Sequence, residues 1–220
     1  MAGFKQELFS QFARVGKALS NGNRLELLEF LAQGERSVED LAKVSGLSVG
    51  NTSQHLKLLR QAGLVTSRKE GLKVHYSITG DDVISLLDSM RGVAQRHIAD
   101  VQQLVSSFLT VKDDLEPIPR EELIRRVKDD LVTVLDVRPP EEFAAGHVPG
   151  AVNVPLAELE SYLDKLEAEQ EIVAYCRGPH CVLAFDAVAK ARDKGLVARR
   201  LEDGFPEWKL AGLPVEMHHF

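Results

Sequence analysis

The chain carries, near its C-terminal end, the stretch Ile172-Val173-Ala174-Tyr175-Cys176-Arg177-Gly178-Pro179-His180-Cys181. Its first four residues are apolar and predict a buried strand, and residues 182–194 have the spacing of a helix. Cys176 then lies between a strand end and a helix N-terminus, where backbone N–H groups and the helix dipole favour the reactive thiolate. We expect Arg177 and His180 to add positive charge to this loop.

Composition limits the class of protein. The 220 residues fit one large or two small domains, and an apolar fraction of 44% is sufficient for globular cores. No apolar run is long enough to cross a membrane, and the charged N-terminus lacks the core of a secretory signal. We therefore expect a cytoplasmic protein without a membrane partner. A structural disulfide is rare there, so the two cysteines, Cys176 and Cys181, indicate redox or sulfur chemistry.

The charges are distributed unevenly along the chain. Residues 1–110 hold 13 Lys and Arg against 11 Asp and Glu, a net charge of +2, whereas residues 111–220 hold 14 against 22, a net charge of -8. Only the first half suits an anionic polymer. Acidic residues, with Pro117 and the following Pro119, predict a stiff linker over residues 111–118, between domains at 1–110 and 119–220.

The first domain has the pattern of a helix-turn-helix followed by a β-hairpin. After a first amphipathic helix, Asn23 is the expected cap of the second helix and Ser37 that of the third. A fourth helix is expected over residues 49–62 after a short glycine turn. Two alternating runs, residues 64–68 and 73–78, predict a hairpin wing with residues 69–72 between them.

The fourth helix and the wing carry a local surplus of four positive charges, a requirement for phosphate contacts. The basic residues are Lys57, Arg60, Arg68, Lys69 and Lys73, against Glu70 alone. The expected exposed face of the fourth helix offers small polar groups that suit base edges in a major groove: Asn51, Thr52, Ser53, Gln54 and His55. The alternative is an ordinary solvated helix surface.

This order of elements resembles the ArsR/SmtB family of winged-helix repressors. The resemblance lies in residues 18–25, Ala-Leu-Ser-Asn-Gly-Asn-Arg-Leu, in residues 53–65, Ser-Gln-His-Leu-Lys-Leu-Leu-Arg-Gln-Ala-Gly-Leu-Val, and in the His75-Tyr76 pair. It implies binding to a double-stranded operator by a homodimer built from the first and last helices. An apolar seam over about 26 residues of a single last helix supports the dimer independently: Val83, Leu87, Met90, Ala94, Ile98, Val101, Val105 and Phe108.

Many members of that family sense metals, through cysteines on the third helix or through Asp, His and Glu sets on the last. Residues 35–40 contain no cysteine, and the last helix has only His97 and Asp100. A lone His–Asp pair is more often a surface hydrogen bond than a metal site. We therefore expect no metal and no cofactor.

The second domain alternates short apolar strands with helices, which predicts an α/β fold with a mostly parallel sheet. Its strands are expected at residues 131–138, 172–175 and 198–201, and a short helix opens at Pro140. Across residues 119–216 these blocks resemble the rhodanese (thiosulfate sulfurtransferase) family. The resemblance implies that Cys176 carries a persulfide and passes its sulfur to an acceptor.

The loop departs from the usual rhodanese pattern. Its fourth position is Pro179, which removes one N–H from the loop, and its sixth is Cys181 where an arginine often holds the anionic donor. We therefore expect weak thiosulfate turnover. Val182 stands where phosphatase and arsenate-reductase loops end in arginine, so those reactions are set aside. Cys181 itself is a small buried residue, a resolving thiol, or a partner of Cys176 on a soft ion such as arsenite.

The leading hypothesis is a DNA-binding transcription regulator whose rhodanese-like domain senses reactive sulfur or another thiol-reactive signal through Cys176, with Cys181. The first alternative is an active sulfurtransferase with an autoregulatory DNA-binding domain. In the second alternative the C-terminal domain is an inert interaction module.

Overall fold

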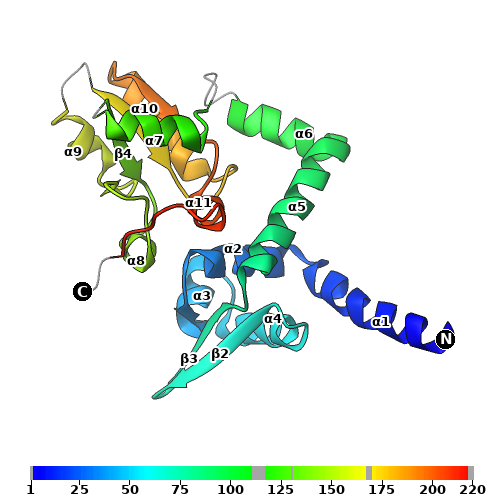
Figure 1. Cartoon of the computed structure of the whole chain (residues 1–220). Helices are drawn as coiled ribbons and strands as arrows, with labels where there is room; N and C mark the ends of the chain where they lie inside the picture. Colours follow the sequence, from blue (N-terminus) through cyan, green and yellow to red (C-terminus); the bar gives the residue numbers. More distant parts are fainter. Residues whose placement is uncertain (1, 111–116, 130, 167–169, 218–220) are drawn as a thin grey trace. The chain divides into compact units, whose positions relative to one another are not determined.

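A computed structural model describes residues 2–110, 117–129, 131–166 and 170–217, and it contains two compact units, residues 1–87 and 88–220 (Figure 1). Helix α5 (Asp81–His97) crosses this division. Residues 111–116 of the predicted linker lie outside the described residues. The limits 1–110, 111–118 and 119–220 therefore stay predictions.

The first unit is a winged helix-turn-helix, as the sequence predicts. The third and fourth helices meet at Gly46, whose left-handed φ of 70° ends the third helix as C-terminal glycines commonly do. The three strands form an antiparallel sheet in the order β1-β3-β2. The elements are α1 (Ala2–Leu19), α2 (Gly22–Gln33), β1 (Arg36–Ser37), α3 (Val38–Ser45), α4 (Val49–Gln61), β2 (Val65–Glu70) and β3 (Lys73–Ile78).

Two local predictions for this unit are wrong in detail. Asn21, and not Asn23, caps α2, because the helix starts two residues earlier and the Asn21 side chain accepts the Arg24 N–H at 3.2 Å. The Ser37 cap of α3 is confirmed by its contact with the Asp40 N–H at 3.1 Å. The wing turn is shorter than predicted, because Glu70 pairs with Lys73 and the left-handed Gly71 supports a two-residue turn.

The predicted single long last helix is also wrong. Helix α5 ends at His97, and Ile98 has extended backbone angles before α6 (Ala99–Val105) and the π-helical turn η1 (Ser106–Thr110). Basic Arg96 and His97 end one helix and acidic Asp100 starts the next, as helix dipoles favour. The apolar spacing of the predicted seam continues across Ile98, so the sequence pattern gave no sign that the helix ends there.

The second unit contains a parallel four-stranded sheet in the order β5-β4-β6-β7, as the predicted α/β class requires. The two strands at its centre are β4 (Val132–Asp136) and β6 (Glu171–Tyr175), with β5 (Val152–Asn153) and β7 (Ala198–Arg200) at the edges. The helices are α7 (Arg120–Lys128), α8 (Pro140–Ala145), α9 (Leu159–Leu163), α10 (Val182–Asp193) and α11 (Phe205–Leu210).

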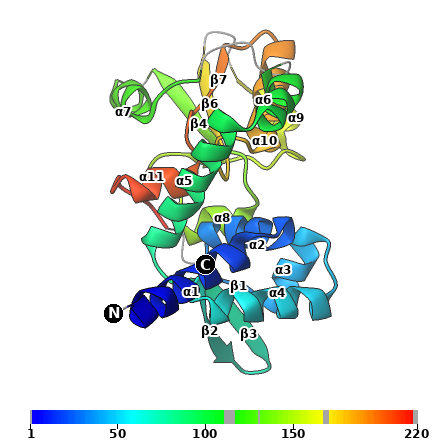
Figure 2. The ribbon, with the colours of Figure 1, turned by 90° about the vertical axis from the view of Figure 1, so that its right-hand side faces the viewer.

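Apolar side chains fill both faces of this sheet, and alternation along β6 decides which face each residue meets. Ile172, Ala174 and Cys176 belong to the core beneath α9 and α10. Val173 and Tyr175 belong to the core on the other face, with residues of α7 and α11. Figure 2 shows α7 on one side of the strands and α9 and α10 on the other. The same alternation therefore turns Cys176 toward α10.

A fully buried ion pair closes the C-terminal end of β4. Asp136 and Arg138 have no solvent exposure, and Arg138 Nη2 lies 2.6 Å from Asp136 Oδ2. The Tyr175 hydroxyl donates to the same carboxylate at 2.5 Å, and Arg138 also donates to the Gly146 carbonyl. The Arg138 guanidinium lies 4.2 Å from the centre of the Phe205 ring. One network thus joins β4, β6, the end of α8 and the start of α11.

Among the described residues, no helix combines the length and the apolar character that crossing a bilayer requires.

Removal of the carboxylate tests the network. Asp136→Ala leaves Arg138 buried without its counter-charge, and we expect the second unit to lose about 3–5 kcal/mol of unfolding free energy. Tyr175→Phe removes one hydroxyl that serves both Asp136 and the Val148 N–H, and should cost about 1–3 kcal/mol. Urea unfolding followed by fluorescence of Trp208, the only tryptophan, reports on this unit. An Asp136→Ala midpoint equal to that of the unchanged chain contradicts the account.

Candidate functional site

The cysteine loop connects β6 to α10. Cys176 follows the last residue of β6 and is 1% exposed, whereas Cys181 is the N-terminal cap residue of α10 and is partly exposed. The loop closes on itself through the Cys181 N–H, which donates to the Gly178 carbonyl at 3.1 Å. It is also attached to α11, because the Phe205 N–H donates to the Cys176 carbonyl at 3.0 Å.

The two cysteines form a disulfide, with their Cα atoms 6.1 Å apart. This separation lies within the normal range for such a bond. The role of Cys181 as a small buried residue, a resolving thiol or a partner of Cys176 on a soft ion stays a prediction. Pro179 and His180 lie between the two cysteines, half-buried, and Val182 is the first, exposed residue of α10.

The Arg177 side chain is paired with a carboxylate. Its guanidinium makes a two-pronged contact with the Glu142 carboxylate, with Nη2 2.8 Å from Oε1 and Nε 2.9 Å from Oε2. The Glu142 side chain is 1% exposed, so a buried carboxylate neutralises Arg177 and anchors the loop to α8. The sequence analysis did not find the Glu142 partner, because a pairing across 35 residues leaves no local pattern.

His180 does not supply a positive charge at neutral pH either. Burial of the ring lowers the pKa of His180 below its usual value, which favours the neutral imidazole. The charges of Arg91 and Arg200 also lower the pKa of His180. The N-terminus of α10, where Cys181 is the cap residue, adds the positive end of a helix dipole to the loop.

Gly204 is a site residue that the sequence analysis missed. A Cβ atom there would overlap the Gly178 backbone and the Arg177 carbonyl carbon, so the cysteine loop packs directly on Gly204. The Glu207 carboxylate accepts the Gly204 N–H at 3.1 Å and fixes the turn into α11. The signal in the sequence was the Gly-Phe-Pro-Glu spacing, which has an acid three residues after the cap.

The polar face of α4 is smaller than predicted. Asn51, Ser53 and Gln54 are exposed, but Thr52 is fully buried and its hydroxyl donates to the Ser48 carbonyl at 3.0 Å. Thr52 was misplaced because it lies on the inward side of the helix with Leu56 and Leu59. His55 is partly buried, and its Nδ1 has no partner among the described residues.

The surplus of positive charge on α4 and the wing is also smaller than the sequence count indicated. Arg68 contacts both Glu35 at 2.6 Å and Glu70 at 2.5 Å, and these hydrogen bonds raise the pKa of Arg68. Glu35 precedes the window in which the charges were counted, so the sequence analysis did not set it against Arg68. Arg60 is exposed and donates to the Ser67 hydroxyl at 3.0 Å. Lys57 of α4 and the wing residues Lys69 and Lys73 are exposed.

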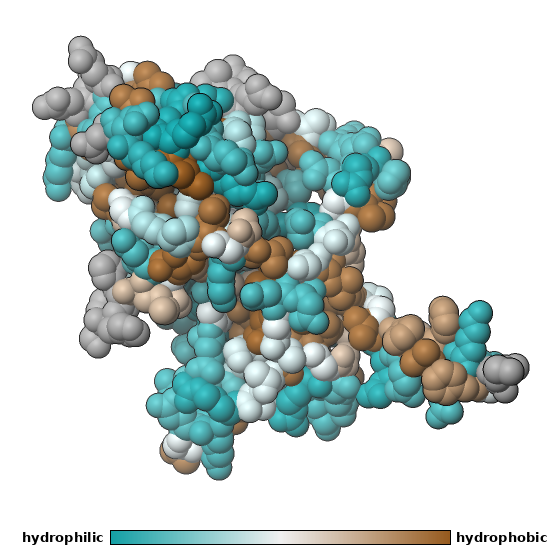
Figure 3. Space-filling model, in the orientation of Figure 1, coloured by the Kyte–Doolittle hydropathy of each residue, from teal (hydrophilic) through white to brown (hydrophobic). Residues whose placement is uncertain are grey.

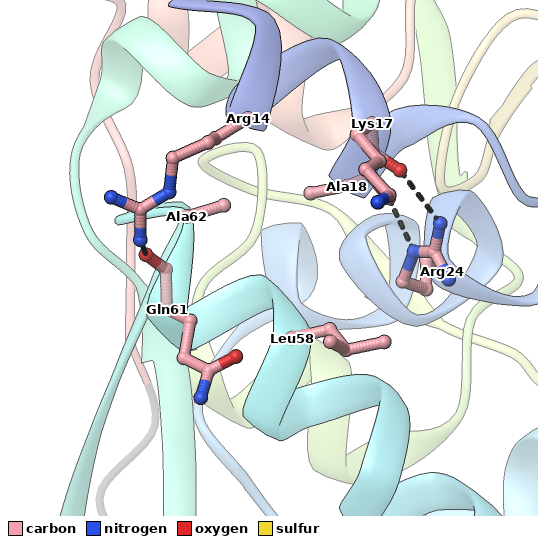
Figure 4. A pocket seen from close by; sticks show the side chains of 7 residues that line it. All are labelled: Arg14, Lys17, Ala18, Arg24, Leu58, Gln61 and Ala62. Carbon is pink, nitrogen blue, oxygen red and sulfur yellow. Dashed lines mark hydrogen bonds between the residues drawn. The ribbon is translucent and has the colours of Figure 1, made fainter. Parts of the chain in front are cut away.

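A pocket of about 340 Å³ lies where α1, α2 and α4 meet (Figure 4). Its two arginines cap helix ends: Arg14 donates to the Gln61 carbonyl at 2.9 Å, and Arg24 donates to the Lys17 and Ala18 carbonyls. The contacts attach α1 directly to the end of α4. The lining residues are Arg14, Lys17, Ala18, Arg24, Leu58, Gln61 and Ala62.

Comparison with known proteins identifies both halves. Residues 21–67 match the model of the bacterial regulatory protein arsR family, and residues 119–211 match the rhodanese-like domain. The HTH-type transcriptional regulator Rv0324 of Mycobacterium tuberculosis is 49% identical over 212 residues, which cover 96% of this chain and 93% of that protein. The chain belongs to the ArsR family.

Two solved structures each resemble one part of this ArsR-family regulator. The homodimeric winged helix-turn-helix domain Mb0332 of Mycobacterium bovis is 45% identical, with a TM-score of 0.41, over 44% of this chain and 89% of that one. A rhodanese-related protein of Thermoplasma volcanium is 29% identical, with a TM-score of 0.41, over 46% of this chain and 98% of that one. The family matches confirm the resemblances inferred from the sequence.

A methyl group on Gly204 tests how the regulator positions its loop. Gly204→Ala should displace the loop backbone and slow formation of the Cys176–Cys181 disulfide in the reduced chain, because the new Cβ overlaps Gly178. Gly178→Ala is the matched control, since its Cβ would meet neighbouring atoms at ordinary contact distance. The measurement is the rate of thiol loss under a glutathione redox buffer. Equal rates for Gly204→Ala and the unchanged chain contradict the packing.

Proposed function

We propose that this regulator binds a double-stranded operator as a homodimer and senses reactive sulfur, or a related thiol-reactive signal, through Cys176 with Cys181. One observation carries the proposal. The chain that has an ArsR-family helix-turn-helix also has two cysteines in one rhodanese-like loop, with their sulfur atoms bonded. Once a reductant has returned it to two thiols, such a pair changes its covalent state when a sulfur donor arrives.

Operator binding is supported by the exposed groups of α4 and the wing. Asn51, Ser53 and Gln54 present amide and hydroxyl groups of the kind that contact base edges, and Lys69 and Lys73 suit phosphates. Lys57 and Arg60 add exposed positive charge on the same helix. In this arrangement α4 enters the major groove and the wing contacts the backbone.

Dimerisation is supported by apolar side chains that project from α1. Phe4 is 73% exposed, Phe9 58% and Phe12 59%, which is unusual for three aromatic residues on one helix. Figure 3 shows the apolar surface along this helix. The ArsR resemblance implies dimers built from the first and last helices. We therefore propose that a second copy of the chain packs against these three aromatic side chains.

Sulfur sensing is supported by the position of Cys176 in the loop. The rhodanese resemblance implies that this cysteine takes a sulfane sulfur as a persulfide. A cytoplasmic location, which we propose, keeps both thiols reduced until a donor appears. The link to DNA requires two arrangements of the dimer that differ in operator affinity, one favoured by the reduced loop and one by the modified loop.

Two substitutions separate base contacts from phosphate contacts. Gln54→Ala should relax the sequence preference of the regulator, because it removes an amide that faces base edges. Lys73→Ala should weaken binding to all duplexes and lower the salt slope by about 1. Lys165→Ala, on an exposed lysine of the second unit, is the control and should change nothing. The measurement is a titration of labelled promoter duplex at several salt concentrations. No binding by the full chain at low salt overturns the proposal.

The covalent state of the loop should set operator affinity. Treatment of the reduced dimer with polysulfide is expected to lower affinity by roughly 5–150-fold, the usual range of allosteric coupling. Cys176→Ser should abolish this change, and Cys181→Ser should reduce it while still allowing a persulfide on Cys176. Fluorescence anisotropy with labelled operator measures the effect. Equal affinities in all states leave the second unit as an enzyme or a docking module.

A further inference from the structure

The two cysteines of the loop occupy different positions that suit consecutive steps of one reaction. Cys176 is buried at the end of β6, while Cys181 is partly exposed at the start of α10. The backbone of the loop is held in place by the Arg177–Glu142 contact and by the hydrogen bond from the Phe205 N–H to the Cys176 carbonyl. The Cα separation of 6.1 Å allows a direct bond without backbone movement.

We propose that Cys181 resolves a persulfide on Cys176, so that the loop reduces an incoming sulfane sulfur to sulfide and ends as the Cys176–Cys181 disulfide. The inference rests on the proposed function in one respect, namely that Cys176 accepts sulfur. It adds a chemical activity: the regulator consumes the molecule that it senses.

The reaction balances in two displacements with a hydropersulfide donor, R–S–SH. In the first, the Cys176 thiolate bonds to the outer sulfur of the donor and R–S⁻ leaves, which gives Cys176–S–SH. In the second, the Cys181 thiolate bonds to Cys176 Sγ, the bond to the outer sulfur breaks, and HS⁻ leaves. The protons of the two thiols pass to R–S⁻ and HS⁻. Two thiols are oxidised by two electrons, and one sulfane sulfur is reduced to sulfide.

Attack at the inner sulfur follows from the pairing in the structure. The bond joins Cys181 Sγ to Cys176 Sγ itself, which is the atom that must be attacked for sulfide to leave. Cys181 lies at the N-terminus of a 12-residue helix, where the dipole favours its thiolate. Hydrogen sulfide is a stronger acid than an alkyl thiol, so HS⁻ is the better leaving group.

The loop's own side chains give a Cys176 persulfide little positive charge. The Arg177 guanidinium is held by Glu142, and the position that often carries an arginine in rhodaneses is Cys181 itself. Burial keeps His180 mainly neutral at neutral pH. A persulfide on Cys176 lies beside Cys181, whose thiolate is placed to displace the outer sulfur. Reset of the loop then requires a dithiol reductant, which is the class of molecule that must act next.

Glutathione hydropersulfide tests the inference on the reduced full-length chain, because its own leaving group is glutathione and not sulfide. We expect stoichiometric sulfide, measured by bimane labelling, and an intact mass that has lost two hydrogens. Trypsin cuts after Arg177, so only a Cys176–Cys181 bond keeps the two cysteine peptides joined. Cys181→Ser is the matched variant, since serine also caps helices, and it should stop with one added sulfur and release no sulfide. Cys176→Ser should take up no sulfur and release no sulfide.

The outcomes separate this inference from the proposed function. If the unchanged chain keeps an added sulfur on Cys176 and releases no sulfide, the resolving role of Cys181 is wrong while sulfur acceptance stands. If Cys181→Ser takes up no sulfur, Cys176 is not an acceptor and both proposals are wrong.

Discussion

The buried ion pair between Asp136 and Arg138 is the interaction on which the second unit depends. Two opposite charges without solvent exposure are costly to desolvate, and only close geometry with further hydrogen bonds offsets that cost. Tyr175 and Gly146 provide those bonds, and the Phe205 ring covers the guanidinium. Tyr175 directly precedes Cys176, and the Phe205 N–H bonds to the Cys176 carbonyl. The position of Cys176 therefore depends on the Asp136–Arg138 pair, through Tyr175 and Phe205.

The residues of the loop differ from those of a strongly charged anion site. Its arginine is committed to Glu142, its histidine is mainly neutral, and a second thiol replaces a further arginine. A loop that must bind and turn over an anionic donor benefits from fixed positive charge. A loop that must change its covalent state once per signal benefits from a second thiol within bonding distance. The observed residues fit the second requirement.

Much of the fold followed from local patterns. Alternation and helical spacing located the wing, the helix-turn-helix and the central strands, and the Ser37 cap was read from its spacing to Asp40. Features that depend on distant partners did not follow. The Glu142 contact of Arg177 and the Glu35 contact of Arg68 span more than thirty residues each, so no window of sequence contains them. Thr52 was placed on the wrong face because its small polar side chain is typical of surfaces, although its hydroxyl bonds to its own helix.

The central claim is that loop chemistry and operator release are one event. The most direct measurement mixes a preformed complex of reduced regulator and labelled operator with glutathione hydropersulfide, and follows anisotropy and sulfide in the same sample. The account predicts that anisotropy falls at the rate at which sulfide appears, and that a dithiol reductant restores it. Complete disulfide formation with unchanged anisotropy would contradict the account.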